Sequence, residues 1–147
     1  MSADFNLQRF VKAQEADYAR ALSELRAGRK QSHWMWYIFP QLAGLGRSEM
    51  ARRYALSGRE EALAYLEHPL LGARLEECTL ALLSHDTLTA HQILGSPDDL
   101  KLHSCMTLFA RVAPENPLFQ QALDRYFAGK PDEASLRLLG GGAGSAP

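Results

Sequence analysis

The feature that most constrains this chain is a dense aromatic stretch running from Gln31 to Ser48. Positions 33 to 39 hold both tryptophans of the protein, together with a histidine, a tyrosine and a phenylalanine. So much apolar surface cannot lie in water without forming a large exposed patch. The stretch must therefore be core, the wall of a pocket, or both.

The rest of the sequence predicts helices. From Leu7 to Ala27 apolar residues recur at steps of three and four, and Gly28 suits the left-handed position after a helix end. Similar patterns predict further helices over residues 58–66, 70–83, 97–112, 117–127 and 131–138. Clear strands with period-two alternation are absent. We therefore expect an all-α or mainly α fold, a compact single domain of six to eight helices, several of them short.

Local signals predict where several elements begin and end. Ser32 fits the N-cap of a short helix through the aromatic residues, which Pro40 must end. A short buried strand is the alternative, because periodicity cannot separate the two over so few residues. Ser48 is placed to cap a following helix, and Ser96-Pro97 predicts another start with Ser96 as the capping residue. We expect a domain of residues 1–139 and a flexible glycine-rich tail of residues 140–147.

Composition narrows the classes of partner. The 147 residues fit one domain, and a formal net charge of −1 gives no overall field to hold nucleic acid or an anionic membrane. The sequence shows no secretory signal and no stretch approaching a membrane span. Cys78 and Cys105 match no metal-binding spacing, so a reduced cytoplasmic protein with no metal and no cofactor is the simplest interpretation. The oligomeric state is left open.

Several motifs resemble the DUF1810 family. They are Ser32-His33-Trp34-Met35-Trp36-Tyr37-Ile38-Phe39-Pro40-Gln41-Leu42, Gly44-Leu45-Gly46, His68-Pro69-Leu70-Leu71-Gly72, and Asp98-Asp99-x-Lys101-Leu102-x-Ser104-Cys105-Met106-Thr107-Leu108-Phe109. The resemblance extends to about Leu139. Because the family is named for lacking an assigned function, the resemblance implies relatives without implying a reaction.

The order of motifs is also similar to the NADAR superfamily. An early aromatic-rich segment, an aliphatic Leu-Gly-x-Arg-Leu and an Asp-x-x-Lys-like helix start follow one another in the chain. This similarity implies a helical fold and an association with ADP-ribose derivatives and N-glycosidic bond chemistry. No catalytic residue is carried over from it. It raises the expectation of a nucleotide-like ligand.

Two parts of the aromatic stretch are candidates for ligand binding. Trp36 and Tyr37 can form a flat wall for a base or a nicotinamide-like ring, although filling the core is an equal alternative for both. Gln41 lies on the part of the stretch that remains available for function. The residues favoured as core are Trp34, Met35, Ile38 and Phe39.

The turn after the aromatic residues is a candidate anion site. Gly44 and Gly46 let backbone amides approach an anion, and Arg47 and Ser48 add donors at a predicted helix start. These residues can hold a phosphate or pyrophosphate. A plain turn followed by an N-cap explains them equally well.

The candidate catalytic residues are His33, Asp99 and Lys101. The usual pKa of a histidine lies near neutrality, which suits His33 to proton transfer, although a structural role at a helix start is the alternative. Asp99, Lys101 and the nearby Ser104 are polar positions on a helix expected to be central, where buried polar groups need partners. Ordinary helix-start chemistry also explains the acidic residues there.

These candidates lead to two hypotheses. In the first, the protein binds a nucleotide-like small molecule derived from ADP-ribose or NAD and possesses an N-glycosidase-type hydrolase activity, with His33, Asp99 or Lys101 positioning water or the ribose. In the second, it is a noncatalytic protein-interaction module whose aromatic motif serves as core. The sequence leaves open whether the protein is an enzyme.

Overall fold

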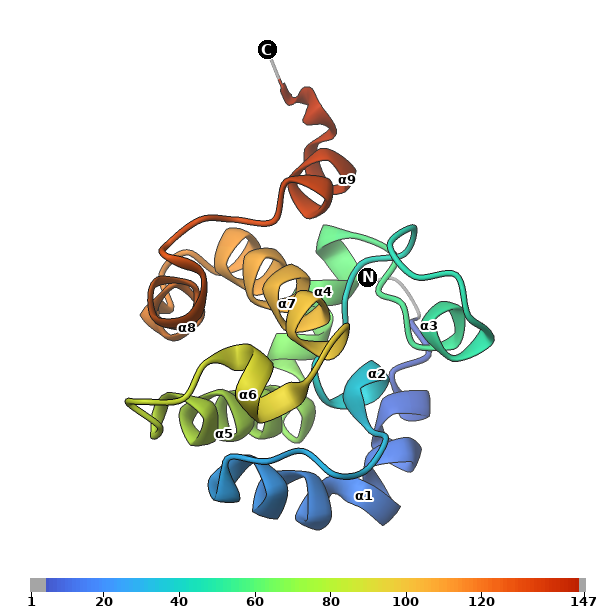
Figure 1. Ribbon diagram of the computed structural model, residues 1–147. Coiled ribbons are helices and arrows are strands. Elements are labelled where there is room, and N and C mark those ends of the chain that lie inside the picture. The colour runs from blue at the N-terminus through green and yellow to red at the C-terminus, as the bar shows by residue number, and fades with distance from the viewer. Residues whose placement is uncertain (1–4, 146–147) are drawn as a thin grey trace.

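The structure, a computed structural model, describes residues 5–145, and the side chains up to residue 140. Within that range the chain forms nine helices and no strand (Figure 1). They are α1 (Gln8–Ala27), α2 (Met35–Ile38), α3 (Glu49–Arg53), α4 (Arg59–Glu67), α5 (Leu71–Leu83), α6 (Ala90–Leu94), α7 (Asp98–Val112), α8 (Pro117–Phe127) and α9 (Glu133–Ser145). The expected all-α fold is confirmed, and short elements such as α3 and α6 bring the number of helices in this range to nine.

Helix α7 lies at the centre of the domain. It packs against α4, α6, α8 and α9, while α1 lies beside α5 at the bottom of the view in Figure 1. Its buried residues are Leu102, Ser104, Cys105, Met106, Thr107, Leu108, Phe109 and Val112. A helix that is apolar on most of its circumference belongs in the interior. The packing of α7 therefore fixes the position of its first turn, which carries Asp98 and Lys101.

The aromatic segment forms a short helix and contributes to the core. Trp34, Met35, Ile38 and Phe39 are each 2% exposed or less, as the sequence predicted. The segment is helical over four residues as α2 and ends before Pro40. The prediction that Ser32 caps this helix was wrong, because its hydroxyl donates instead to the carboxylate of Glu24 on α1.

Of the other predicted helix boundaries, some are confirmed and some are wrong. Ser48 caps α3 as expected, with its hydroxyl accepting a hydrogen bond from the amide of Ala51 at 3.1 Å. The prediction that Ser96 caps the following helix was wrong, because Pro97 occupies the N-cap position and no side chain bonds there. Helix α9 continues past residue 138 to Ser145, into the segment expected to be a tail. Residues 146–147 of that tail lie outside the described residues, and its flexibility stays a prediction.

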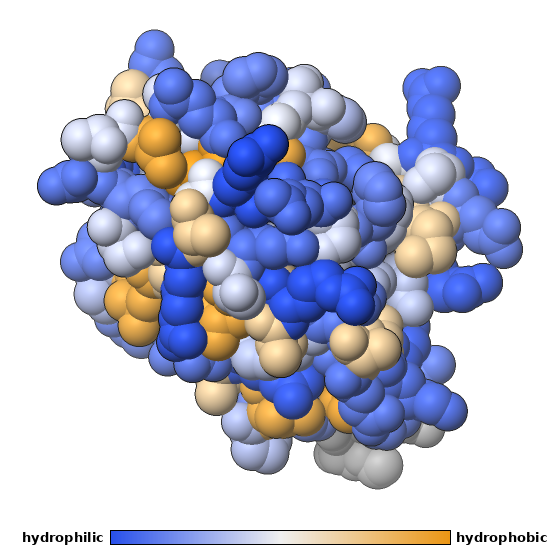
Figure 2. Space-filling model, turned by 60° about the horizontal axis from the view of Figure 1, so that its bottom comes forward, coloured by the Kyte–Doolittle hydropathy of each residue, from blue (hydrophilic) through white to orange (hydrophobic). Residues whose placement is uncertain are grey.

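Apolar and hydrophilic side chains alternate over short distances on the surface. Figure 2 shows the lower face of Figure 1, where apolar areas are separated by hydrophilic side chains. Scattered apolar residues of this kind are ordinary on a surface that faces water. None of the helices in residues 5–145 combines the length and apolarity needed to cross a membrane.

The approach of α4 to α5 depends on Gly72. A Cβ atom added at this buried glycine would overlap the backbone carbonyl of Leu66, which cannot rotate away as a side chain can. We expect Gly72→Ala to lower the free energy of unfolding by about 1–3 kcal/mol, the usual cost of forcing extra volume into a packed interior. Thermal or denaturant unfolding followed by circular dichroism measures the change.

The matched control for this substitution is Gly58→Ser. Gly58 is the N-cap of α4, and nothing lies within 4 Å of a Cβ added there. Serine is a favoured N-cap residue, so this variant should be as stable as the parent or slightly more stable. Equal stability of the Gly72→Ala variant and the parent would contradict the steric argument.

Candidate functional site

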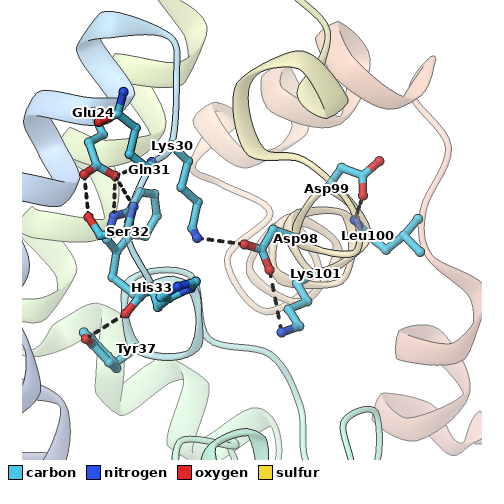
Figure 3. A network of polar contacts seen from close by, with 11 residues as sticks. Glu24, Lys30, Gln31, Ser32, His33, Tyr37, Asp98, Asp99, Leu100 and Lys101 are labelled. Carbon is cyan, nitrogen blue, oxygen red and sulfur yellow. Dashed lines mark hydrogen bonds and ion pairs between the residues drawn. The ribbon is translucent and has the colours of Figure 1, made fainter.

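The start of the aromatic segment is held by one carboxylate, that of Glu24 on α1 (Figure 3). It accepts hydrogen bonds from the amides of Gln31 at 2.8 Å and Ser32 at 3.0 Å, and from the indole nitrogen of Trp34 at 2.9 Å. The hydroxyl of Ser32 donates to it as well. These four donors turn the chain back after α1 and place the ring of Trp34 in the core.

The hydrogen bonds keep Glu24 ionised. Partial burial alone raises the pKa of its carboxyl, but donation from Ser32, Gln31 and Trp34 outweighs burial and lowers the pKa to about 2. Hydrogen bonds to the charged form favour that form. The carboxylate is therefore a fixed negative charge at neutral pH, beside the segment that leads into the site.

Two lysines share one carboxylate between the aromatic segment and α7. The ammonium of Lys30 lies 2.9 Å from one oxygen of Asp98, and that of Lys101 lies 3.7 Å from the other (Figure 3). The three side chains are only 8%, 18% and 24% exposed for Lys30, Asp98 and Lys101. We name these three residues the Lys30–Asp98–Lys101 cluster. With both lysines protonated and the aspartate ionised, it carries one net positive charge.

Each lysine of the cluster also faces a tryptophan. The ammonium of Lys30 lies 5.0 Å from the ring centroid of Trp34, and that of Lys101 lies 5.3 Å from the ring of Trp36. Both distances fall within the range of a cation–π contact. The cluster therefore joins the first turn of α7 to the aromatic segment.

Three cavities meet around this region. A space of about 10 Å³ lies behind Trp36, lined also by Gln41 and Lys101. A larger cavity of about 310 Å³ is lined by Gln41, Gly46, Lys101 and Ser104 among others, and a third of about 360 Å³ is lined by Gly44, Gly46 and Arg52. Because Gly46 lines both of the larger cavities, we treat them as neighbours and name them the lysine cavity and the turn cavity.

The structure brings five of the predicted site residues together. Trp36, Gln41, Gly46, Lys101 and Ser104 line the space behind Trp36 or the lysine cavity. The hydroxyl of Ser104 donates to the carbonyl of Leu100 at 3.3 Å and to Asp132 at 3.0 Å. Ser104 thus also holds the start of α9 against α7. The turn cavity adds Gly44 to the group.

The other predicted residues have different surroundings. The ring of Tyr37 is buried, and its hydroxyl donates to Asp17 on α1. Burial, followed by the hydrogen bond to Asp17, raises the pKa of Tyr37 well above its usual value. Tyr37 therefore fastens α2 to α1, and in this conformation it offers little surface to a ligand.

The side chains of the two remaining catalytic candidates, His33 and Asp99, point in different directions relative to Lys101 (Figure 3). His33 is exposed, and its ring extends from the start of α2 toward the side on which Asp98 and Lys101 lie (Figure 3). Asp99 accepts a hydrogen bond from the amide of Leu100 and lies 3.5 Å from His91. Its carboxylate points away from Lys101 in Figure 3. The first turn of α7 therefore presents Asp98, and not Asp99, to the lysines.

Of the predicted turn residues, Gly44 and Gly46 line a cavity, whereas Arg47 and Ser48 do not line the lysine or turn cavity. Arg47 and Ser48 are exposed, and the hydroxyl of Ser48 is engaged in capping α3. The guanidinium-bearing residue that lines the turn cavity is Arg52, on α3.

Lys30, Asp98, Arg52 and Asp132 belong to this region and were not among the site residues predicted from the sequence. A signal existed for Asp98, because residues three apart on a helix face each other, and Asp98 is three residues before Lys101. No comparable local signal marks Lys30 or Arg52, whose surroundings depend on the tertiary fold. In the part of the chain that the structure describes, no three His, Cys, Asp or Glu residues gather in a way that can hold a metal ion.

The comparisons with known proteins agree with this fold. The family model described as "Protein of unknown function (DUF1810)" matches residues 4–139. The chain belongs to the DUF1810 family. Its structure is similar to the crystal structure of the conserved hypothetical protein Rv1873 from Mycobacterium tuberculosis, with a TM-score of 0.90 and 51% sequence identity over 92% of this chain and 96% of that one. No curated protein matches the chain.

Neither the family description nor the name of the crystallised relative assigns an activity. The similarity to the NADAR superfamily stays a prediction. The geometry of the site is therefore the basis for a function of this DUF1810 protein.

The ionised Glu24 carboxylate generates a pH-dependent prediction for this DUF1810 protein. We expect Glu24→Gln to lower the free energy of unfolding at neutral pH by about 1–2 kcal/mol, because a charged acceptor of four donors is lost from a partly exposed position. The folded-state pKa of about 2 lies below the ordinary value of 4.5, so this stabilisation is present above pH 4.5 and is lost as the pH falls toward 2. The difference between variant and parent should shrink over that window.

Chemical denaturation at a series of pH values measures this difference. The matched control is Glu15→Gln, an exposed carboxylate on the same helix. That variant should unfold like the parent at every pH. A Glu24→Gln variant whose deficit stayed constant from neutral pH down to pH 2 would show that the carboxylate charge is not the source of the stabilisation.

Proposed function

We propose that this DUF1810 protein binds a nucleotide-like small molecule of the ADP-ribose or NAD-derived class in the lysine cavity. The observation that carries the proposal is the position of Lys101. Its side chain lines the lysine cavity and the space behind Trp36, and its ammonium lies 5.3 Å from the Trp36 ring. A cation beside an aromatic ring suits a ligand with an anionic group and a flat base.

The charge of the site favours an anion. Within the Lys30–Asp98–Lys101 cluster, the carboxylate makes its short contact of 2.9 Å with Lys30 and a longer one of 3.7 Å with Lys101. The charge of Lys101 is therefore the less fully balanced of the two. A partly buried, incompletely balanced ammonium attracts a phosphate more strongly than a fully solvated one does.

Asp132 adds a negative charge to the same cavity. One of its carboxylate oxygens accepts hydrogen bonds from the hydroxyls of Ser104 and Ser135 and from the amide of Ser135. These donors hold the charge at the start of α9, where a helix N-terminus favours it. The repulsion that Asp132 exerts on a bound phosphate is thereby reduced.

Cavity size indicates how such a ligand fits. Small-molecule sites usually enclose about 300–1,000 Å³, so a volume of about 310 Å³ suits a mononucleotide-sized portion. The rest of a larger ligand can reach the turn cavity of about 360 Å³ past Gly46, which lines both cavities. Arg52 would then take a second anionic group. The space behind Trp36 is too small for a ring, so a base would stack on the exposed part of the indole.

Hydrolysis of an N-glycosidic bond is a further step that the geometry supports less. Glycoside cleavage commonly uses a carboxylate that is free to act on water or on the sugar. The carboxylate of Asp98, which contacts Lys101, and that of Asp132, which lines the same cavity, are already held by lysines or by hydrogen-bond donors. His33 and Lys101 remain the candidates for positioning water. Ligand binding is therefore the function for which the arrangement offers the most support.

A second candidate function is a noncatalytic interaction module. The specific observation in its favour is the burial of Trp34, Met35, Tyr37, Ile38 and Phe39, which makes most of the aromatic motif part of the core. Under this alternative, the cluster ties α7 to the aromatic segment and has no ligand. A panel of nucleotides would then leave the protein unaffected.

Calorimetric and thermal-shift titrations with ADP-ribose, NAD and AMP test the proposal. We expect at least one of them to raise the melting temperature, since a ligand that binds only the folded state stabilises it. Lys101→Ala and Trp36→Leu should each weaken binding by about tenfold or more, a loss of about 1.4 kcal/mol or more. Separation of the reaction mixture by chromatography detects any released base.

Arg47→Ala is the matched control, because it also removes one positive charge but lies outside the residues that line the lysine and turn cavities. This variant should bind like the parent. Absence of a response to all three ligands at millimolar concentration, or equal binding by the parent and the Lys101→Ala variant, would refute the proposal.

A further inference from the structure

A separate cavity lies at the other end of α7. It has a volume of about 500 Å³, larger than the lysine cavity. Its walls come from the C-terminal half of α7, from α8, from the first residue of α4 and from the chain between α8 and α9. That chain turns back at Gly129, whose φ of 75° favours glycine, and Pro131 follows along the wall.

The walls combine apolar residues with two arginines. Ala110, Pro114, Leu123 and Pro131 supply apolar surface, and Arg59 and Arg111 supply positive charge. The hydroxyl of Thr107, which also lines the cavity, already donates to the carbonyl of His103 and accepts from the amide of Asp132. Recognition here would therefore rest on apolar contact and on the two guanidinium groups.

Neither guanidinium is neutralised within the described residues. An ion pair requires a carboxylate oxygen within 4.0 Å of a side-chain nitrogen, and within the described residues neither Arg59 nor Arg111 has such a partner. Arg59 donates to the backbone carbonyl of Arg111 at 3.5 Å, a contact that helps to cap the end of α7. Two positive groups on one cavity favour an anion, and guanidinium groups match the geometry of carboxylate and phosphate.

On α8, the carboxylate of Asp124 lies beside the cavity wall and already accepts a hydrogen bond. The amide of Gln120, a lining residue, donates to the carboxylate of Asp124 at 3.0 Å. The same carboxylate oxygen lies 3.0 Å from the position that a Cβ atom would take at Gly129, another lining residue. Asp124 therefore places a negative charge beside this part of the wall, and the amide of Gln120 partly balances it.

We propose that this cavity is a second ligand site, for a small organic anion that joins one carboxylate or phosphate group to a compact apolar body. The anionic group would lie between Arg59 and Arg111, and the apolar body would rest against Ala110, Leu123 and Pro131. A volume of about 500 Å³ lies within the usual range for small-molecule sites. The site shares no lining residue with the lysine or turn cavity, so it stands or falls independently of the proposed nucleotide site.

Titration of the isotope-labelled full chain, followed by the NMR shifts of its backbone amides, tests this site. The probes are phenyl phosphate, benzoate and inorganic phosphate. We expect saturable shifts confined to the neighbourhood of residues 107–131 with phenyl phosphate or benzoate, and binding of inorganic phosphate weaker by about fivefold or more because it lacks an apolar body. The stronger of the two aromatic probes identifies the preferred anionic group.

Variants separate the site from general electrostatic attraction. Arg111→Ala should weaken binding by about tenfold or more without changing the melting temperature, because Arg111 is exposed and its side chain forms no hydrogen bond or ion pair within the described residues. Ala110→Phe fills the cavity while keeping both arginines, and it should also abolish binding. Lys12→Ala removes one positive charge from α1 and should leave binding unchanged.

The outcomes are decisive in either direction. Saturable binding that is lost in the Arg111→Ala and Ala110→Phe variants and kept in Lys12→Ala establishes the site. Absence of saturable shifts at about 10 mM probe, or binding that survives both cavity variants, overturns the proposal. If Arg111→Ala lowers the melting temperature, Ala110→Phe alone decides between these outcomes.

Discussion

The rest of the site depends on the reversal of the chain after α1. A very apolar segment follows that helix and must pack against it, so the connecting residues need partners that water no longer supplies. The carboxylate of Glu24 provides them, accepting from the amides of Gln31 and Ser32 and from the indole of Trp34. One ionised side chain therefore sets the entry angle of the aromatic segment, the burial of Trp34 and the position from which Lys30 reaches across to α7.

A second contact, the ion pair between Lys30 and Asp98, connects this packing arrangement to the candidate site. Lys30 is nearly buried, and a buried ammonium needs a partner, which is Asp98 at the start of α7. The same carboxylate is also the partner of Lys101, so two positive charges share one negative charge. The excess lies at Lys101, next to Trp36 and on the wall of two cavities. The ion pair between Lys30 and Asp98 holds α7 to the aromatic segment, and it leaves the ammonium of Lys101 incompletely balanced on the wall of the lysine cavity.

Most of the fold and part of the site could be predicted from the sequence, and the failures at Ser32 and Asp99 have one cause. Helical periodicity and burial identified the helices and the core residues, since both depend on local pattern and on apolarity. The cap assigned to Ser32 failed because its hydroxyl donates to a distant carboxylate on α1. The cap assigned to Ser96 failed because α7 begins one residue later than expected, with Pro97 as the N-cap. The choice of Asp99 over its neighbour could not anticipate Lys30, which approaches from a remote part of the chain. Local sequence specifies elements, whereas tertiary contacts decide which polar groups meet.

The position of Lys101 gives a reason to look for a ligand there. It lies in the first turns of α7, where the helix dipole disfavours a positive charge and favours the acids Asp98 and Asp99. Asp98 is already the partner of a nearly buried lysine, and Asp99 faces His91 instead. The ion pair with Asp98, three residues earlier, and the cation–π contact with the half-buried Trp36 hold the ammonium of Lys101 in place. Because Asp98 is shared with Lys30, an anion bound in the adjoining cavity would add a counter-charge for Lys101 beside those of Asp98 and Asp132.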